Sequence, residues 1–557
     1  MKRNLDQLAN YEHDLLIIGG GIYGATMAWD AVLKGLSVAL VERGDFGEAT
    51  SANSLKIVHG GLRYLQTLDV ERMRESIRER RVLLNIAPHL VHPLQCVMPT
   101  YGHLMKGREL MFAGVLMNDI ISFDRNRFVD PEKSIPRGRI ISKKECLQLV
   151  PGIDGKRVTG GVLWTDAQMY NSERLTLAFI LSAVREGAVV ANYVEANELL
   201  KRNGYIQGIK AIDRLTGNDL EIRAKCVVNA TGAWVDEVLK GTIHDNERLN
   251  LSTAMNLVIR RNMLKECAAG VLGKFENTTP DGTIYQGSRV LFMTPWREFT
   301  IIGTFHRPYH GNPDKMKVTE TEIEELLKEI NSALPEDPIK REEVSFFHKG
   351  FLAMDGIHPK TGEVMLTKHY KIRDHSKEDG LDGIISVVGV KYTTARDVAE
   401  KTVNLVFKKL GRKSPKCRSH EMVLVGGRIQ GFDDFLSQAF AQSPKDLDDS
   451  VIRHLVYNYG SQYPRILADG EKDPNGLKII SGSKEVLRTE ILHCIREEMA
   501  RKLSDVVLRR TDLGSGGHPG EKSLKSVASI MARELGWDKN RLRNELMELN
   551  AFYVLAD

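Results

Sequence analysis

The stretch HDLLIIGGGIYGATMAWDAVLKGLSVALVER, residues 13–43, decides the fold of the N-terminal part of this chain. Its apolar runs at 14–18 and 37–41 are typical of short buried strands. Between them, residues 22–34 carry apolar side chains at helical spacing, and Gly35 follows as a C-cap. The sequence therefore predicts a strand, a helix and a second strand, the unit from which parallel α/β sheets are built.

Three glycines occupy the turn between the first strand and the helix. Gly19, Gly21 and Gly24 stand where the turn must be tight, the backbone must approach a pyrophosphate, and the helix must pack closely on the strand. The N-terminus of the helix adds unpaired N–H groups and a positive dipole for phosphates. Glu42 closes the second strand, where a carboxylate can accept hydrogen bonds from a ribose. The unit is predicted to bind a dinucleotide, and by itself it does not separate NAD from FAD.

The segments after Glu42 favour FAD. A nicotinamide domain usually continues with another strand–helix unit, whereas residues 45–65, DFGEATSANSLKIVHGGLRYL, are rich in Ser, Thr, Gly and Asn. Such a loop offers many hydrogen-bond donors to a large cofactor and little to a core. Two further strand-to-helix turns follow only near residues 226–232 and 384–393. This spacing predicts one FAD domain interrupted by insertions.

Composition excludes several other classes of protein. The chain has 557 residues, of which 42% are hydrophobic and 27% charged, with a net charge of +5, so a dedicated nucleic-acid binder is not expected. The six cysteines lie far apart without a C-x-x-C pair, which favours reduced thiols and predicts no metal site. We find no secretory signal and no apolar run of about 18 residues. We therefore expect a cytoplasmic protein, with a peripheral contact at the inner membrane face left open.

A series of motifs in order extends over nearly the whole chain. They are GGGIYG (19–24), KIVHGGLRYL (56–65), VVNATGAW (227–234), IIGT (301–304) and GVKYTTAR (389–396), followed by HLVYNYGSQYPRIL (454–467) and VVLRRTDLG (506–514). In these segments the chain resembles the FAD-dependent glycerol-3-phosphate dehydrogenases, within the wider D-amino-acid-oxidase-like flavoprotein superfamily.

The resemblance implies a function. Such an enzyme holds FAD without a metal and oxidises the C2 alcohol of glycerol 3-phosphate to dihydroxyacetone phosphate, with hydride transfer to the flavin N5. It would belong to glycerol metabolism, with quinone or oxygen as electron acceptor. The expected partners are thus a small anionic substrate and this acceptor, with a homodimer as one assembly to test.

The predicted fold class is α/β, with a Rossmann-like FAD-binding domain interrupted by an antiparallel-sheet substrate domain and followed by a helical domain. The expected FAD segments are residues 1–75, 160–240 and 375–412, the substrate or cap regions are 76–159 and 241–374, and the C-terminal helical domain is 413–557. The charged run ERMRESIRERR, residues 71–81, is predicted to be the solvated face of a helix.

The candidate cofactor residues come from the polar loop and the three strand-to-helix turns. They are Gly19, Gly21, Ile22, Tyr23, Gly24, Glu42, Thr50, Ser51, Ser54, His59, Gly60, Gly61, Ala230, Thr231, Gly232, Gly389, Lys391 and Thr393.

Five residues are candidates for the chemistry itself. Alcohol oxidation by a flavin needs a base for the hydroxyl proton and positive charge for an anionic substrate and for the reduced flavin. His59 is the candidate base, with a purely structural role in the cofactor loop as the alternative. Arg63 and Lys391 match an arginine and a lysine that the family places at its site. His306 and Lys368 are further candidates.

The substrate half departs from the family pattern. Leu352 and Ala353 stand where the family has Arg and Pro, and Lys368 stands at a second phosphate-binding arginine. The family's T-T-D becomes residues 304–306, Thr-Phe-His, and its D-D-A-R becomes residues 171–174, Asn-Ser-Glu-Arg. A lysine replaces bidentate phosphate recognition only in part. Another polyol phosphate, a hydroxy acid or an amine therefore remains an alternative substrate, and a non-catalytic flavin-binding protein an alternative class.

Overall fold

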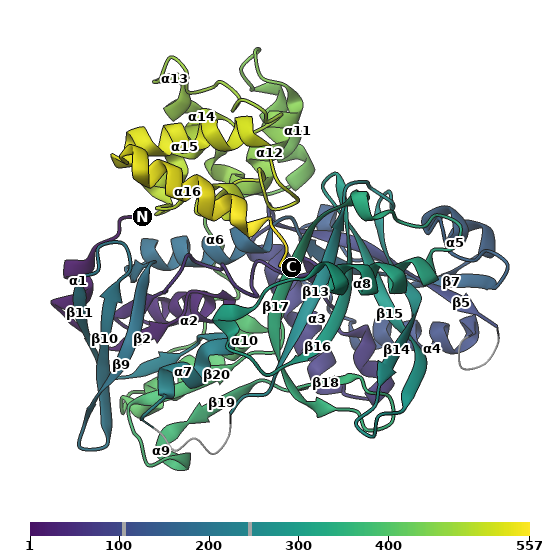
Figure 1. The fold of residues 1–557 in the computed structure, drawn as a ribbon, viewed down its shortest axis with the longest axis horizontal. Coiled ribbons are helices and arrows are strands. Elements are labelled where there is room, and N and C mark those ends of the chain that lie inside the picture. Colours follow the sequence, from purple (N-terminus) through teal and green to yellow (C-terminus); the bar gives the residue numbers. More distant parts are fainter. Residues whose placement is uncertain (103–106, 243–247, 557) are drawn as a thin grey trace.

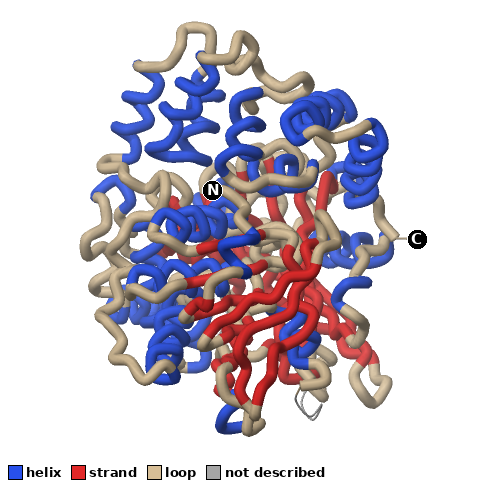
Figure 2. The backbone as a smooth tube through the Cα atoms, turned by 90° about the vertical axis from the view of Figure 1, so that its left-hand side faces the viewer, coloured by secondary structure: helices blue, strands red, loops and turns tan. Residues whose placement is uncertain are grey.

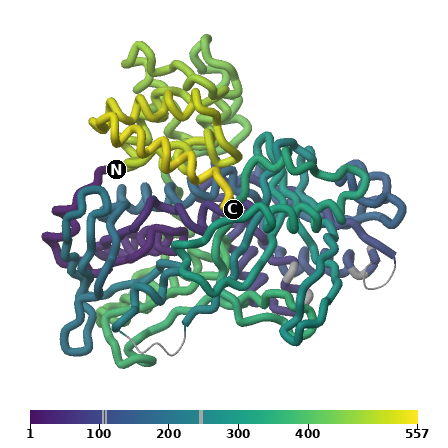
Figure 3. The backbone as a smooth tube through the Cα atoms, in the orientation of Figure 1, coloured from purple at the N-terminus to yellow at the C-terminus, as the bar shows by residue number. Residues whose placement is uncertain are grey.

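A computed structural model describes residues 1–102, 107–242 and 248–556 of the chain. Figure 1 shows three parts: a first sheet with its helices, a large curled sheet beside it, and a group of helices above both. The helices above are formed by the C-terminal residues, as the colours of Figure 3 show, and the N-terminus lies close beneath them. The α/β fold class predicted from the sequence is confirmed by this arrangement.

The first sheet is the predicted nucleotide-binding sheet. Its six strands have the order β19-β20-β12-β2-β3-β8, and all neighbours are parallel except β19 and β20. The strands are β2 (Leu15–Ile18), β3 (Val38–Val41), β8 (Val189–Ala191), β12 (Val227–Asn229), β19 (Lys371–Asp374) and β20 (Ile384–Val388). The helices α2 (Ile22–Leu33), α6 (Ser172–Arg185) and α10 (Ala395–Lys409) pack together against it, sharing one hydrophobic core.

A small four-stranded sheet covers the other face of the first sheet. Its order is β1-β11-β10-β9, from β1 (Glu12–His13), β9 (Val194–Arg202), β10 (Tyr205–Asp213) and β11 (Asp219–Ala224). One core cluster joins both sheets, with Leu16 and Val41 from the first and Ile206 and Ile222 from the second. Hairpin turns connect β9 to β10 and β10 to β11, which pair antiparallel.

The large sheet is mainly antiparallel and has the order β18-β17-β13-β16-β15-β14-β5-β7-β4, with β6 paired to β7. Its strands are β4 (Ile57–Val58), β5 (Val91–Tyr101), β6 (Arg139–Ile141), β7 (Val158–Met169), β13 (Leu251–Ile259), β14 (Cys267–Thr278), β15 (Ile284–Trp296), β16 (Phe299–Tyr309), β17 (Val344–Ile357) and β18 (Val364–Leu366). The helices α4 (Arg108–Ile121), α5 (Lys143–Leu149) and α8 (Glu320–Ala333) pack on it. Thr319 and Glu322 form a capping box at the start of α8.

Two sequence-based boundaries differ from this topology. Strand β7 pairs with β5 along its length, so residues 158–169 belong to the large sheet, although a cofactor segment was expected from residue 160. Conversely, β19 (371–374) extends the first sheet before the expected start at residue 375. An apolar strand does not reveal from its own sequence which of two sheets it joins, because that depends on its partners.

The C-terminal part consists of helices, which Figure 2 shows as a cap of helices over the strands. They are α11 (Phe432–Ala441), α12 (Asp449–Tyr459), α13 (Tyr463–Glu471), α14 (Arg488–Glu497), the π-helical turn η8 (Asp505–Arg510), α15 (Glu521–Leu535) and α16 (Lys539–Phe552). Two core clusters of their own hold them together. The predicted helical domain is confirmed.

The charged helix is not simply solvated. The run 71–81 lies in α3 (Val70–Ile86), as predicted, but Glu79 and Arg80 are buried. Glu79 accepts two hydrogen bonds from Arg396 of α10, at 2.7 and 2.8 Å. These charges tie α3 to the cofactor domain and so correct the prediction of an exposed face.

Candidate active site

A cavity of about 2990 Å³ runs between the first sheet, the large sheet and the C-terminal helices. Of the candidate cofactor residues, all but Gly24 and Gly60 line it. Among the candidate catalytic residues, His59, His306, Lys368 and Lys391 line it as well. Arg63 lies in the short helix η1 (Leu62–Thr67), but its side chain lies outside the described part of the structure. The fold thus gathers segments far apart in sequence around one space.

The glycine turn has the close approaches that the motif predicts. Gly19 has a φ of +107°, and a Cβ there would lie 2.7 Å from the Ala230 carbonyl oxygen. A Cβ at Gly24 would overlap the carbonyl oxygen of Gly19, so α2 packs on β2 only with glycine there. Gly21 is the N-cap of α2 and leaves its first turn open to the cavity. A backbone shaped in this way fits the pyrophosphate of a dinucleotide.

Glu42 holds the turn from the end of β3. Its Oε2 accepts a hydrogen bond from the Gly20 N–H at 2.7 Å, and its Oε1 accepts one from Gly44 at 2.8 Å. Burial raises the pKa of this carboxyl above its usual value. Each oxygen retains a further lone pair, so the predicted contact with a ribose hydroxyl is compatible with these bonds.

The third strand-to-helix turn is fastened to α2 by Tyr23. Its hydroxyl donates to the Lys391 carbonyl at 2.7 Å and accepts from the Val390 N–H at 3.1 Å. Burial raises the pKa of Tyr23 to about 12, so it stays a neutral donor. A Cβ at Gly389 would overlap the Tyr23 ring. Tyr23 therefore sets the path of the backbone that precedes α10.

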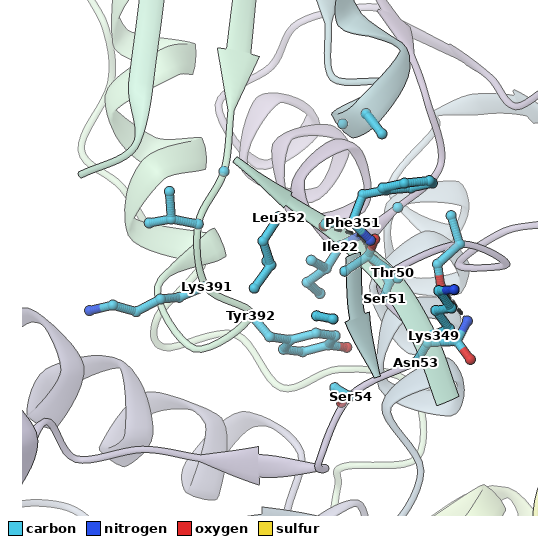
Figure 4. Close-up of a pocket in the computed structure, with 18 of the residues that line it drawn as sticks. Ile22, Thr50, Ser51, Asn53, Ser54, Lys349, Phe351, Leu352, Lys391 and Tyr392 are labelled. Atoms are coloured by element: carbon cyan, nitrogen blue, oxygen red, sulfur yellow. Dashed lines mark hydrogen bonds between the residues drawn. The ribbon is translucent and has the colours of Figure 1, made fainter. Parts of the chain in front are cut away.

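The Lys391 side chain leaves this turn toward α3. Its Nζ lies 3.9 Å from the centre of the Tyr64 ring. The Arg72 guanidinium carbon lies 4.3 Å from the centre of the same ring. Figure 4 shows Lys391 directed away from Leu352 and Ile22. Burial, reinforced by Arg72, lowers the pKa of Lys391 to about 7.

His59 faces the cavity with a buried carboxylate behind it. Half of its side chain is exposed, and its Nδ1 lies 3.6 Å from Asp166 Oδ2. Asp166 also accepts hydrogen bonds from the Gly60 N–H and from Arg80 Nη1, both at 2.7 Å. Burial alone would raise the pKa of Asp166, but His59 and Arg80 outweigh it and lower that pKa to about 2. The histidine is therefore oriented by an ionised carboxylate.

Asp166 is a site residue that the sequence reasoning missed. It stands in β7, where most neighbouring residues are apolar and buried. A lone acid inside an apolar strand carries the cost of burying a charge and so has to have a partner. That signal was present in the sequence, although the partners themselves come from other elements.

Among the described side chains on the substrate side of the cavity, one lysine is already paired with a carboxylate. Leu352 and Lys368 both line it, from β17 and from the loop after β18. Lys349, which also lines it, is held by Glu322, with Nζ 2.9 Å from each carboxylate oxygen. His348 of β17 is buried, and its Nε2 lies 3.2 Å from the Ser515 carbonyl of the C-terminal part. His348 does not line the cavity.

Comparisons with known proteins agree with this geometry. The FAD-dependent oxidoreductase family matches residues 14–385, and the C-terminal domain of alpha-glycerophosphate oxidase matches residues 417–542. The glycerol-3-phosphate dehydrogenase of Synechocystis sp. is 32% identical over 562 residues, covering 99% of this chain and 98% of that protein. The human mitochondrial glycerol-3-phosphate dehydrogenase is 31% identical, covering 97% of this chain and 73% of that protein.

A solved structure extends the similarity to three dimensions. The glycerol-3-phosphate dehydrogenase from Bacillus halodurans complexed with FAD has a TM-score of 0.76 and 26% identity, covering 98% of this chain and 95% of that one. The chain therefore belongs to the FAD-dependent oxidoreductase family. Within that family, it carries the C-terminal domain of the alpha-glycerophosphate oxidase type.

Proposed function

We propose that this FAD-dependent oxidoreductase is a glycerol-3-phosphate dehydrogenase. One observation carries the proposal: His59, His306 and Lys368 line the same cavity as the glycine turn. A base and two cationic or ionisable groups thus face the space next to the dinucleotide site. The full-length relatives named glycerol-3-phosphate dehydrogenase support the choice of substrate.

In the proposed reaction, His59 removes the proton of the substrate hydroxyl, and Asp166 orients the His59 imidazole for this proton transfer. FAD, when bound, would supply the hydride acceptor of the reaction. The buried Arg80 and the Gly60 N–H keep Asp166 in place on its other side. The chain therefore contributes a proton acceptor and the group that positions it.

The anionic end of the substrate is assigned to Lys368 and His306. Lys368 is exposed at the cavity, whereas Lys349 is already neutralised by Glu322. Leu352 supplies an apolar wall where the family pattern has an arginine. We therefore expect weaker phosphate binding than a bidentate arginine gives, because a lysine acts as a point charge.

The substrate is tested by anaerobic titration of the FAD-loaded protein, followed by the loss of the oxidised flavin absorbance. Glycerol 3-phosphate should reduce the flavin, and glycerol should not, because it lacks the anionic group. If glycine or lactate bleached the flavin instead, the substrate would be an amine or a hydroxy acid and not an alcohol phosphate. No bleaching by any of the four would indicate a flavin-binding protein without this catalysis.

The role of Lys368 is tested by its change to Met, with Lys360→Met as the matched control. Lys360 is an exposed lysine of the same region that does not line the cavity. Lys368→Met should raise KM for glycerol 3-phosphate by roughly 10-fold or more, as expected for a lost charge-assisted contact. Equal KM values in both variants would remove Lys368 from the substrate site.

We also propose a peripheral membrane contact on the inner face. No described helix has both the length and the apolarity to cross a bilayer. However, α4 and the turn after it expose Leu116 (50%), Ile120 (62%), Phe123 (80%) and Phe128 (83%), here called the α4 surface. Leu116 and Ile120 lie four residues apart on one face of α4, and Phe123 and Phe128 follow in the turn. Exposed apolar side chains also gather in this way on helices that lie in a membrane interface. Figure 1 shows α4 at the edge of the molecule.

Vesicle flotation tests this contact. Wild-type protein should float with vesicles of phosphatidylglycerol and phosphatidylcholine, and Ile120→Ser with Phe123→Ser should abolish the binding. The matched control is Ile284→Ser, which changes a side chain 68% exposed at the start of β15. Unchanged flotation of the double variant would rule the α4 surface out as the contact.

The remaining predictions concern the surroundings of the enzyme. All six cysteines are free and buried, which supports a cytoplasmic location. A role in glycerol metabolism follows from the proposed substrate. The choice between quinone and oxygen as electron acceptor stays a prediction, to be decided by steady-state rates with each. The homodimer also stays a prediction, to be decided by sedimentation.

A further inference from the structure

The polar loop between β3 and β4, residues 44–54, is hydrogen-bonded to the glycine turn at one end and to the large sheet at the other. At its base, the Gly47 N–H donates to the Gly20 carbonyl at 3.0 Å, which ties the loop to the glycine turn. At its other end, Thr50 Oγ1 accepts from the Phe351 N–H of β17 at 2.9 Å, a contact visible in Figure 4. The position of this loop therefore determines where the nucleotide-binding turn meets the large sheet.

The C-terminal part binds the same loop through Asp45, which is fully buried. Asp45 Oδ2 accepts hydrogen bonds from Arg509 Nε and Arg510 Nη1, both at 2.7 Å, and its Oδ1 accepts from Arg510 Nη2 at 2.8 Å. Asn192 Nδ2 donates to the same Oδ1 at 3.0 Å. One carboxylate of the cofactor loop is thus held by two adjacent arginines of η8.

The charges of this cluster balance within the interior. Asp505, in η8, accepts from Arg509 Nη2 at 2.8 Å, so two carboxylates face two guanidinium groups. Burial alone would raise the pKa of Asp45, but Arg510 and Arg509 lower it to about 2. Removing the Asp45 charge leaves a buried arginine without its partner, which is far more disruptive than the loss of an exposed pair.

The C-terminal segment also forms part of the cavity wall. Ser504, Leu508 and Arg509 line the cavity that Glu42 and Ile22 line from the first sheet. The helical domain is therefore in contact with the cofactor space itself, as well as with the loop behind it.

We propose that the Asp45–Arg509–Arg510 cluster makes the docked C-terminal domain part of the FAD site, by holding the cofactor loop in its binding position. These three are positioning residues: they act on FAD through the 44–54 loop. The inference rests on FAD as the cofactor of the family and is independent of which substrate the enzyme oxidises.

The test uses the full-length chain, stripped of FAD and titrated with FAD by flavin fluorescence. Asp45→Asn keeps the shape of the side chain and removes its charge, and should weaken FAD binding by roughly 10-fold. Glu498→Gln is the matched control, because Glu498 forms a buried ion pair with Arg174 at 2.7 Å across the same domain contact. That pair lies outside the cofactor loop, and Arg510 donates only to the backbone carbonyl of Glu498, at 3.2 and 3.3 Å, which glutamine retains. Glu498→Gln should therefore leave the Kd for FAD unchanged.

A conservative variant guards against misfolding. Arg510→Lys retains one charge and loses the fork that contacts both oxygens of Asp45, so its FAD affinity should fall between wild type and Asp45→Asn. Equal affinity of Asp45→Asn and wild type would overturn the proposal. If Asp45→Asn does not fold, unchanged FAD binding by Arg510→Lys would overturn it as well, as would equal weakening by Glu498→Gln.

Thermodynamic reciprocity supplies a second readout. If the docked domain strengthens FAD binding, FAD must stabilise the docked domain to the same extent. Added FAD should therefore slow hydrogen exchange of the amides of residues 505–510 in the wild type, and do so much less in Arg510→Lys. Exchange that is insensitive to FAD in the wild type would contradict the coupling. Neither measurement involves glycerol 3-phosphate, so a failure of this proposal can be distinguished from a failure of the proposed activity.

Discussion

At the residue scale, the candidate site includes a carboxylate that none of the sequence motifs contains. His59 was a candidate base from its place in the IVHGGLRY segment, and the structure adds Asp166 behind its Nδ1. An imidazole next to a fixed carboxylate has one ring nitrogen occupied and the other available to the cavity. This arrangement turns a histidine in a flexible-looking, glycine-rich segment into an oriented group.

Changing Asp166 to Asn tests that orientation. We expect kcat/KM for glycerol 3-phosphate to fall on the order of 100-fold, the usual range for a misaligned general base. His59→Asn is the companion variant, and the double variant should be no worse than His59→Asn alone. Additive losses in the double variant would assign Asp166 a structural role only.

At the element scale, the contact between α2 and β2 illustrates how one glycine serves both packing and binding. A Cβ at Gly24 would overlap the Gly19 carbonyl oxygen, whereas a Cβ at Gly114 of α4 would meet nothing within 4 Å. Both glycines lie in helices, so changing either one to alanine alters helix propensity by a similar amount. A difference in stability between the two variants therefore reports the steric effect at Gly24.

Gly24→Ala should therefore lower the free energy of unfolding by about 1–3 kcal/mol, as expected for overpacking, and weaken FAD binding. Gly114→Ala should raise it by roughly 0.5–1 kcal/mol, since alanine favours helix and nothing is displaced. Urea unfolding of the FAD-free proteins measures both values. A Gly24→Ala protein as stable as the wild type, with full FAD affinity, would show that α2 can move away from the strand without cost.

At the scale of the whole molecule, buried charges hold the C-terminal helices on the catalytic part. His454 of α12 is buried, with Nε2 2.8 Å from Glu490 Oε2 and Nδ1 3.1 Å from Asp512 Oδ2. Asp512 in turn accepts from the Tyr170 hydroxyl at 2.7 Å, beyond the end of β7. Burial alone would lower the pKa of His454, but Glu490 and Asp512 outweigh it and raise that pKa to about 10.

This raised pKa predicts a loss of stability in alkali. The pKa of His454 is about 10 in the folded protein, whereas in the unfolded chain the imidazole releases its proton near its ordinary pKa of 6.5. The contribution is therefore complete below pH 6.5 and is lost as the pH rises toward 10. Its size is on the order of 3–5 kcal/mol.

Denaturant unfolding at about pH 6.5, 8 and 9.5 checks this prediction, because these pH values span the range between the unfolded and folded pKa of His454. His454→Gln should be less stable than wild type at pH 6.5, and the difference should shrink as the pH rises. His420, which is partly exposed and pairs with Glu421, offers the control variant His420→Gln. A difference between wild type and His454→Gln that stays constant over this range would mean that His454 does not carry the charge.

Sequence by itself determined the local elements and the cofactor class. The strand–helix–strand unit, the tight glycine turn, the capping box of α8 and the helical C-terminal domain each depend on residues close together in the chain. Short-range sterics and hydrogen bonds decide such features, so a local pattern carries enough information. The motif series also indicated the family, which the comparisons confirm.

Tertiary structure alone decided which groups meet. Three contacts join segments that are distant in the sequence. Asp166 lies behind His59, Asp45 lies between Arg509 and Arg510, and Glu79, from a run predicted to be solvated, is buried against Arg396. It also placed β7 in the large sheet and turned Lys391 toward Tyr64. The free energy of a buried charge depends on partners hundreds of residues away, and only the folded chain brings those partners within hydrogen-bonding distance.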